Sequence, residues 1–431
     1  MLLALYRLMM QASTPVLGAY LQKRLRAGKE DPLRTHERRG RPQMPRPQGT
    51  LIWFHAASVG ESLSLLALIH RVRRDYPASA VMVTTGTVTS AALMADRLPE
   101  GAFHQYIPVD HPAWVATFLD HWRPDVVLWA ESELWPNMLC AVRERRIPAV
   151  LLNARMSQES FMRWRYARGS IRQMLGAFRL CLAQNGAEAE RLQVLGAPAV
   201  KVSANLKYAA APLPVDVTAL ENLRAQVMGR PLLLWASTHA GEEARAFALH
   251  RQLAVQFPNI LTVIVPRHAA RGADIAAEAA AVGVTLARRS LAQAVPVNAG
   301  IYLADTMGEL GLFYRLCPFV VMGGTFADIG GHNPIEPAQV GCTIFWGPIG
   351  YNFITILDDF RTAGAIVDTT NEEELYTRVS AALAAPAEWR SYGDKAAQMT
   401  ADKSGVLDSI MADIAPVVDA ALTVDLAKAA S

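Results

Sequence analysis

The sequence predicts an α/β protein with two domains, each built on a parallel sheet. From residue 50 onward, short runs of β-branched and other apolar residues alternate with helical stretches, and a polar stretch with two prolines (209–218) interrupts the pattern. Such alternation is typical of parallel sheets covered by helices on both faces. With 431 residues, the chain is also long enough to form two hydrophobic cores.

The first predicted domain spans residues 50–208 and contains six candidate strands. They are LIWFHA (51–56), VMVTTGT (81–87), HQYIPVD (104–110), DVVLWAE (125–131), AVLLNAR (149–155) and RLCLAQN (179–185), and KVSANLKYA (201–209) closes this half. Most of these runs precede a stretch with the apolar periodicity of a helix.

The second predicted domain spans residues 219–431, after the linker 209–218, and ends in helical segments. Its candidate strands are PLLLWAST (231–238), ILTVIVPR (260–267), VTLARR (284–289), GIYLAD (300–305), PFVVMGGT (318–325), CTIFWGP (342–348) and AIVDT (365–369). We expect two Rossmann-like domains facing a central cleft, since ligands bind at the carboxyl ends of the strands in such folds.

Residues 1–29 form an apolar and basic segment ahead of these domains. On a helix, Arg7, Gln11, Thr14 and Gly18 share one narrow stripe, Leu and Met cover the rest, and Lys23, Arg24, Arg26 and Lys29 follow. Two interpretations remain: a membrane-associating helix with its basic residues on anionic head groups, or a helix packed on the protein's own core. Residues 30–49 are expected to form an exposed linker.

Composition and charge exclude several functional classes. Hydrophobic residues make up 52% of the chain, which excludes general disorder. Four Cys without a CxxC pair argue against a disulfide scaffold or a Cys-type zinc site. Residues 1–50 hold ten Lys or Arg against three Asp or Glu, whereas the remainder holds 32 against 36. We expect no nucleic-acid partner, because the basic excess is absent from the folded body.

Acidic residues follow two strands of the first domain. Glu61 lies in HAASVGES (55–62), where Ser58-x-x-Glu61 fits a capping box, although the carboxylate could also act as a general base. Glu131 and Glu133 begin ESELWPN (131–137) and would point to one side if the extended backbone persisted; the alternative is helix capping. Lys207, in NLK (205–207), is either a solvated charge or a ligand for an anion.

The second domain carries small and polar residues after several strands, in STHAGEE (237–243), PRH (266–268), DTMGEL (305–310) and GGTFADIGGHNPIEPAQVG (323–341). Arg267 can bind a phosphate, a helix beginning near Asn333-Pro334 offers N–H groups, and Glu336 could accept hydrogen bonds from ribose hydroxyls. No G-x-G-x-x-G or G-x-x-x-x-G-K-[ST] sequence is present, and neither is D-x-D or a metal-type His pair. The pattern favours a phosphorylated nucleotide-type ligand and predicts no metal site.

Together these motifs resemble the Kdo transferase family, the 3-deoxy-D-manno-oct-2-ulosonic acid transferases of lipopolysaccharide synthesis. The matching stretches are HAASVGE, ESELWPN, NARMSQESF, ANLKY, STHAGEE, PRH, DTMGEL and GGHNPIEPA. The resemblance implies a GT-B fold and an inverting, metal-independent transfer of Kdo from CMP-Kdo to a lipid A precursor (lipid IVA). It also implies a location at the cytoplasmic face of the inner membrane, contact with its lipids, and no cofactor, because CMP-Kdo is a donor substrate.

The resemblance assigns roles to individual residues. Glu61 matches the general base, and Glu131 and Lys207 match positions that stabilise the transition state. The CMP-binding stretches correspond to Pro266, Arg267, His268, Met307, Gly308, Glu309, Asn333, Pro334, Ile335 and Glu336. The chain departs from the family pattern at Ala204, at Ala269-Ala270 and at Ile349, which puts local donor contacts in doubt.

Two other functions fit the residues alone. A nucleotide-sugar epimerase of the same fold would need neither a membrane anchor nor a lipid acceptor. A non-catalytic, membrane-associated nucleotide-sugar-binding protein would bind donor without turnover and would not require Glu61. The acidic residues at strand ends favour an enzyme.

Overall fold

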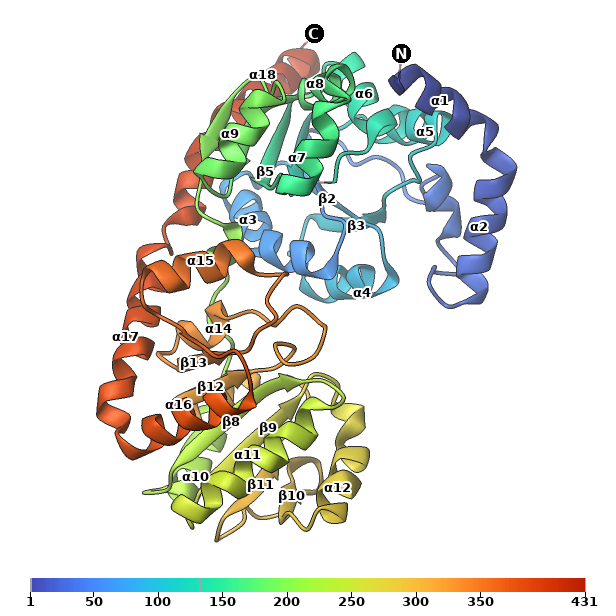
Figure 1. The fold of residues 1–431 in the computed structure, drawn as a ribbon. Helices are drawn as coiled ribbons and strands as arrows, with labels where there is room; N and C mark the ends of the chain where they lie inside the picture. Colours follow the sequence, from blue (N-terminus) through green and yellow to red (C-terminus); the bar gives the residue numbers. More distant parts are fainter. Residues whose placement is uncertain (1, 132, 431) are drawn as a thin grey trace. The chain divides into compact units, whose positions relative to one another are not determined.

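The computed structural model describes residues 2–131 and 133–430, with side chains up to 423, and divides into two compact units (Figure 1). Unit 1 consists of Met1–Ala210 with Gly405–Ser431, and unit 2 of Ala211–Ser404. Each unit is an α/β layer structure around one parallel sheet, so the predicted α/β class with a parallel sheet in each half is confirmed.

Unit 1 contains a seven-stranded sheet in the order β3-β2-β1-β4-β5-β6-β7. Its strands are β1 (Leu51–His55), β2 (Ala80–Thr85), β3 (Ala102–Tyr106), β4 (Val126–Ala130), β5 (Ala149–Ala154), β6 (Phe178–Ala183) and β7 (Val200–Val202). The strands β1 and β4 are almost entirely buried, as expected for central strands covered on both faces. The order reverses between β1 and β4, and this switch point is where ligands bind in open α/β sheets.

The helices of unit 1 pack on this sheet around a core that includes Trp53, Phe118 and Trp129. They are α1 (Leu2–Ala12), α2 (Thr14–Arg26), α3 (Val59–Asp75), α4 (Val88–Arg97), α5 (Pro112–Trp122), α6 (Pro136–Glu144), α7 (Gln158–Arg165), α8 (Arg168–Leu175), α9 (Gly186–Val194) and α18 (Val406–Ala430), with 3-10 helices η1 (Thr35–Arg39) and η2 (Leu206–Ala209).

Unit 2 contains a second seven-stranded sheet in the order β10-β11-β9-β8-β12-β13-β14, which reverses between β8 and β12. The strands are β8 (Leu232–Thr238), β9 (Leu261–Pro266), β10 (Leu286–Arg288), β11 (Gly300–Leu303), β12 (Phe319–Met322), β13 (Thr343–Trp346) and β14 (Val367–Asp368). The helices are α10 (Val217–Val227), α11 (Glu242–Gln256), α12 (Gly272–Ala281), α13 (Leu310–Leu316), α14 (Ile335–Ala338), α15 (Ile354–Thr362), α16 (Glu372–Ala384) and α17 (Pro386–Asp402), with η3 (Ala269–Arg271) and η4 (Arg289–Leu291).

The C-terminal helix α18 belongs to unit 1, which corrects the expected range 219–431 for the second domain. Val406, Ile410, Ile414 and Val418 recur every four residues and are buried. The helix packs against α3, β4 and η2, and Lys201 Nζ contacts Asp413 Oδ1 at 2.6 Å. An amphipathic helix at a chain end can dock on either unit, and the sequence pattern alone does not indicate which.

The first half of the predicted exposed linker 30–49 is not uniformly exposed, whereas residues 41–49 contain no buried residue and no regular secondary structure. Glu37 is buried, and its Oε2 accepts hydrogen bonds from Tyr106 N and Gln105 Nε2, both at 2.8 Å. Arg38 is also buried and donates to the carbonyl oxygen of Ile107. Charged side chains hold this segment against the edge strand β3, which hydropathy alone does not reveal.

The N-terminal helices α1 and α2 contact the rest of unit 1 through a few polar side chains and through Leu3, which packs against its hydrophobic core. Arg7 lies 3.7 Å from Glu144, Thr14 Oγ1 contacts His111 Nε2 at 2.9 Å, and Tyr6 donates to Asp110 at 3.1 Å. Leu2, Leu5, Leu8 and Met9 are left exposed. Leu3, Tyr6 and Met10 are half-buried while Arg7 and Gln11 are exposed, so the face of α1 toward unit 1 is mainly apolar and a second apolar surface is left uncovered.

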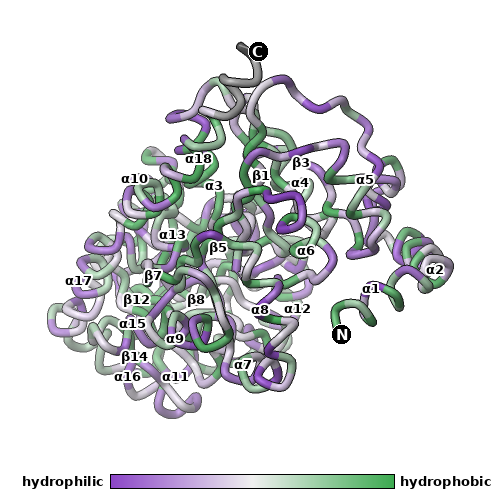
Figure 2. Tube along the Cα trace, turned by 90° about the horizontal axis from the view of Figure 1, so that it is seen from above, coloured by the Kyte–Doolittle hydropathy of each residue, from purple (hydrophilic) through white to green (hydrophobic). Residues whose placement is uncertain are grey.

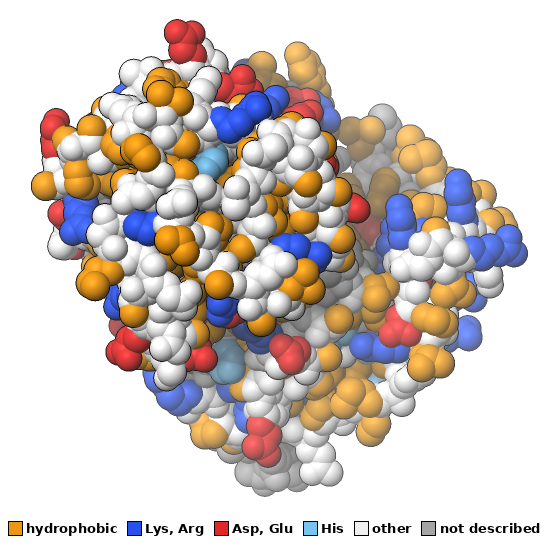
Figure 3. Space-filling view, turned by 90° about the horizontal axis from the view of Figure 1, so that it is seen from below, with side chains coloured by type: hydrophobic (Ala, Val, Ile, Leu, Met, Phe, Trp, Pro, Cys, Tyr) orange, Lys and Arg blue, Asp and Glu red, His pale blue; other side chains and the backbone are white. Residues whose placement is uncertain are grey.

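Figure 2 shows apolar and polar positions mixed along α1 and α2, and Figure 3 shows basic side chains gathered on the side where Figure 2 places α2. Lys23, Arg26 and Lys29 are exposed, whereas Arg24 pairs with Glu30 at 2.6 Å. Within the described part of the chain, no helix combines the length and apolar character needed to cross a bilayer.

Candidate active site

Glu61 occupies the third position of α3, at the β1 side of the switch point in unit 1. Ser58 caps the helix, since its Oγ accepts from Glu61 N at 3.3 Å. In return, Glu61 Oε2 accepts from Ala57 N at 2.8 Å and Oε1 from Ser58 Oγ at 2.9 Å. The cap considered in the sequence is therefore present, although the Glu61 carboxylate accepts from the main-chain N–H of Ala57 rather than from that of the capping residue Ser58. Each carboxylate oxygen accepts one of these hydrogen bonds and keeps a second lone pair, so Glu61 can still take a proton.

Burial raises the pKa of the Glu61 carboxyl group, and the negative charge of Glu131 raises it further. The hydrogen bonds from Ala57 and Ser58 oppose this rise, and Glu133 adds to it. A raised pKa makes a carboxylate a stronger base near neutral pH. The carboxylates from the two motifs lie close enough to interact, as their place at neighbouring strand ends predicts.

Glu131 follows β4 directly and adopts a left-handed backbone conformation, with φ of 57°. The extended state therefore does not persist past the strand, and the alternation expected for Glu131 and Glu133 does not apply. Glu133 Oε2 instead accepts from Trp135 Nε1 at 2.7 Å. The helix α6 begins at Pro136 without a cap from either glutamate; Asp110 caps it by accepting from Asn137 N and Met138 N.

Lys207 lies in η2, which packs against α3, the helix that carries Glu61. Asn205 caps this turn, because its Oδ1 accepts from Lys207 N at 3.0 Å. The structure thus places Glu61, Glu131 and Lys207 on three adjoining elements of unit 1.

In unit 2, the PRH, STHAGEE and GGHNP motifs converge around the β8 side of the switch point. Arg267 and His268 are exposed just after β9, whereas Pro266 is buried as its last residue. His239 Nε2 and His332 Nε2 lie 2.8 Å apart. Burial lowers the pKa of His332 to about 4, and the charges of His239, Arg267 and His268 contribute. The exposed guanidinium of Arg267 is the charged group of this set that can bind an anionic ligand.

The Asn333-Pro334-Ile335-Glu336 segment begins the four-residue helix α14. Asn333 Oδ1 accepts from Ile335 N and its Nδ2 donates to Glu336 Oε1, both at 3.2 Å. The helix predicted near Asn333-Pro334 is therefore a single turn. The main-chain N–H of its first residue, Ile335, already donates to Asn333. Burial holds the pKa of Glu336 above its usual value. The hydrogen bond from Asn333 and the positive charge of Arg267 oppose this rise.

Met307, Gly308 and Glu309 follow β11, the strand next to β9. Met307 is exposed, and Gly308 has φ of 81°, a conformation that favours glycine. Glu309 is engaged by Arg289, whose Nε donates to it at 2.6 Å, and this hydrogen bond lowers its pKa. Glu309 therefore orders the segment rather than presenting a free carboxylate.

Two buried glutamates of the STHAGEE motif support this site, and the sequence analysis assigned them no role. Glu242 accepts from His239 N, Gly324 N and Phe326 N at 2.9, 2.8 and 3.1 Å. Glu243 accepts from Thr238 Oγ1 at 2.8 Å and pairs with Arg271 at 2.6 Å. Both are fully buried at the start of α11. Glu242 joins the segments that follow β8 and β12, and Glu243 joins the end of β8 to η3, which follows β9.

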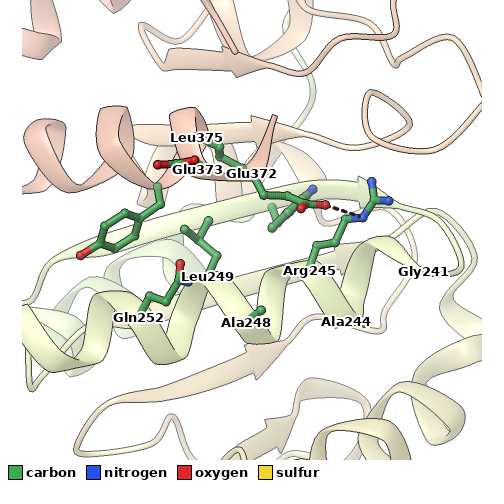
Figure 4. A pocket seen from close by; sticks show the side chains of 11 residues that line it. Gly241, Ala244, Arg245, Ala248, Leu249, Gln252, Glu372, Glu373 and Leu375 are labelled. Atoms are coloured by element: carbon green, nitrogen blue, oxygen red, sulfur yellow. Dashed lines mark ion pairs between the residues drawn. The ribbon is translucent and has the colours of Figure 1, made fainter. Parts of the chain in front are cut away.

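A pocket of about 580 Å³ in unit 2 lies between α11 and α16, where Arg245 pairs with Glu372 at 3.1 Å (Figure 4). None of the predicted site residues lines it. Among the described residues, no group of three or more His, Cys, Asp or Glu side chains is arranged to hold a metal ion.

Comparison with known proteins defines the class as a glycosyltransferase. The family model "3-Deoxy-D-manno-octulosonic-acid transferase (kdotransferase)" matches residues 33–210. A probable mitochondrial 3-deoxy-D-manno-octulosonic acid transferase of Arabidopsis thaliana is 34% identical over 352 residues, 80% of this chain and 79% of the relative. The 3-deoxy-D-manno-octulosonic acid transferase of Bordetella pertussis is 30% identical over 413 residues, 93% and 96% of the two chains. This chain belongs to the 3-deoxy-D-manno-octulosonic acid transferase family.

The fold is also shared with another kind of enzyme. The crystal structure of UDP-GlcNAc 2-epimerase from Neisseria meningitidis, bound to UDP-GlcNAc, has a TM-score of 0.57 and 12% identity, covering 86% of this chain and 100% of the other. At this identity the likeness concerns the fold alone. The sequence relatives, rather than the fold, separate the transferase from the epimerase.

Proposed function

We propose that this protein transfers Kdo from CMP-Kdo to a lipid A precursor, lipid IVA, with inversion at the anomeric carbon and without a metal ion. The observation that carries the proposal is the placement of Glu61 beside Glu131 at the switch point of unit 1, with a raised pKa on Glu61. Unit 1 binds the acceptor and unit 2 binds the donor.

Glu61 is the general base. A sugar hydroxyl has a pKa far above 7, so its proton must leave as its oxygen attacks. The proton passes to the Glu61 carboxylate while the acceptor oxygen forms a bond to the anomeric carbon of Kdo. The bond from that carbon to the CMP phosphate oxygen breaks, and its electron pair leaves with CMP. A single displacement with one base inverts the anomeric configuration.

The leaving phosphate gains negative charge as this bond breaks. Arg267 supports a metal-free account, because its guanidinium is exposed at the end of β9 and has no ion-pair partner among the described residues. Asn333 and Glu336 contact the nucleoside part of CMP, and Met307 and Gly308 line the same ligand. Glu131 and Lys207 stabilise the charge that develops on the transferred sugar and the leaving group.

The N-terminal helices hold the protein at the cytoplasmic face of the inner membrane, beside its lipid acceptor. The support is the exposed apolar face of α1, which contains Leu5, Leu8 and Met9, together with the basic end of α2. Two weak signals of this kind combine into stable membrane association.

Incubation with CMP-Kdo and a tetraacyl lipid A precursor, followed by mass spectrometry, tests the proposal. We expect a product heavier by a Kdo unit, formed equally with and without EDTA. Release of free sugar without a lipid product would favour an epimerase-type reaction, and donor binding without any turnover would favour a binding protein. Loss of activity with EDTA that magnesium restores would refute the metal-free mechanism.

A further inference from the structure

The side chain of Asn153 lies between two of the proposed catalytic elements. Its Nδ2 donates to Glu131 Oε1 at 3.3 Å, and its Oδ1 accepts from Leu206 N at 3.1 Å. Leu206 immediately precedes Lys207 in η2. Asn153 is 4% exposed, so water does not replace these contacts. One buried amide therefore spans from the Glu131 carboxylate to the turn that carries Lys207.

The chemistry of its partners fixes the orientation of this amide. A carboxylate needs a donor, which only the NH₂ group supplies, and the Leu206 N–H needs an acceptor, which only the carbonyl oxygen supplies. A second route reinforces the link: Gln184 Nε2 donates to the main-chain oxygen of Asn153 at 3.0 Å, and Asn205 Nδ2 donates to Gln184 Oε1 at 3.1 Å. The turn η2 is thus linked to Asn153 twice: directly through the Asn153 side chain, and through Gln184 from the Asn153 main-chain oxygen.

The backbone at this point is strained in a way that only a few residues tolerate. Asn153 has φ of 51° and Glu131 has φ of 57°, both in the left-handed region. The residues that precede them, Ala130 and Leu152, are register partners in the β4–β5 pair. The pairing of β5 with β6 shifts register between Leu151 and Ala154. Strained positions persist where surrounding contacts hold them, and they gather at functional sites.

We propose that Asn153 is a positioning residue that holds the Glu131 carboxylate and the Lys207 turn in one fixed arrangement. The inference rests on the proposed roles of Glu131 and Lys207 and adds a residue to which neither the motifs nor the comparisons assign a role. Asn153 acts through its neighbours and does not itself contact the reacting atoms. Asparagine suits the position because it supplies one donor and one acceptor and tolerates a positive φ.

The variant Asn153→Asp tests this assignment, because it keeps the acceptor for Leu206 N but replaces the donor to Glu131 with a second carboxylate. We expect kcat to fall about 10- to 100-fold through displacement of Glu131, with KM for CMP-Kdo unchanged. We also expect the acid limb of the pH–rate profile to move to higher pH, because the added negative charge raises carboxyl pKa values nearby. A merely structural defect would not move that limb.

Asn185→Asp is the matched control, since it makes the same chemical change at the residue that follows Gln184 in the chain. Asn185 Oδ1 accepts from Glu188 N at 2.9 Å as the cap of α9, and aspartate preserves that cap. This variant should keep the wild-type kcat and pH profile. If it also loses activity, added charge in unit 1 rather than the position of Asn153 explains the result, and the proposal fails.

Asn153→Gly keeps the inference falsifiable if the aspartate variant does not fold, because glycine adopts the same φ without strain. It should lose kcat without the upward pH shift, and wild-type kcat would overturn the proposal. Glu131→Gln separates the two claims. If Glu131→Gln is fully active, the proposed function of Glu131 fails. If Glu131→Gln is impaired while Asn153→Asp and Asn153→Gly behave as wild type, only the inference about Asn153 fails.

Discussion

The negative charge of Glu131 raises the pKa of Glu61, although 69 residues separate them in the chain by their numbering. The two follow β1 and β4, the strands between which the sheet order of unit 1 reverses. Parallel strands end at the same edge, so this topology brings the two carboxylates together. The interaction therefore makes the electrostatics of the proposed base depend on a residue from the neighbouring strand.

Glu61→Gln should abolish transfer while preserving the fold. Glutamine keeps an oxygen for the Ala57 N–H but cannot accept a proton. A general base typically accelerates a reaction about 10²–10⁴-fold, so its removal should lower turnover by a comparable factor. The measurement is turnover in the lipid acceptor assay, with thermal unfolding as a check on folding. Glu188→Gln is the matched control, since Glu188 holds the same third position of α9 behind its cap Asn185. Comparable losses of turnover in both variants would show that the loss of a carboxylate at the third position of a helix, not base catalysis, is being measured.

Glu131→Gln should move the acid limb of the pH–rate profile to lower pH. The base acts in its ionised form, so activity falls as the pH drops through the raised pKa of Glu61. Removing the charge of Glu131 lowers that pKa, and the surviving activity then extends to more acidic conditions. Glu133→Gln should shift the limb in the same direction but less, because Glu133 contributes less to the rise. An unmoved limb in Glu131→Gln would contradict the coupling.

The sequence predicted the strands of both sheets except β7, because fully buried parallel strands are short apolar runs between helices, whereas β7 has three residues and is largely exposed. It also indicated Glu61, Glu131 and Arg267, since polar residues at strand ends are conspicuous. It missed Asn153 and Glu242, which act through hydrogen bonds to main-chain groups far away in the chain. Such partners, like the docking of α18, are set by tertiary packing and leave no periodic signal.

Arg267→Ala should weaken CMP binding without destabilising unit 2. A charged hydrogen bond to phosphate contributes about 1.5–3 kcal/mol, so the Kd for CMP in calorimetry should rise about 10- to 100-fold. Arg271→Ala, four residues away, is expected to behave differently. Arg271 pairs with the fully buried Glu243, and removing one partner of a buried pair costs about 3–5 kcal/mol of unfolding free energy. If Arg267→Ala instead lowers stability and leaves CMP affinity intact, its assignment as a ligand residue is wrong.

The exposed face of α1 should provide a salt-independent part of membrane binding. Point variants suit this test better than truncation before residue 50, because Glu37 and Arg38 are buried and their removal would expose β3. Leu5→Gln with Leu8→Gln removes apolar area worth about 1.5–3 kcal/mol for each fully buried leucine. Sedimentation with anionic vesicles should then show weaker binding that high salt releases completely, whereas the wild type is only partly released.

The basic residues at the end of α2 should supply the complementary, salt-sensitive part. Lys23→Gln, Arg26→Gln and Lys29→Gln together should weaken binding at low salt, since each cation near an anionic surface contributes about 1 kcal/mol.

Val194→Gln with Val202→Gln is the control for the leucine pair, because both valines are about half exposed elsewhere in unit 1, at 51% and 52%. If the control weakens binding as much as the leucine pair, the effect is not specific to α1. If neither the leucine nor the basic variants change it, the membrane contact lies elsewhere in unit 1, and the arginines Arg163, Arg165 and Arg168 are the next to replace.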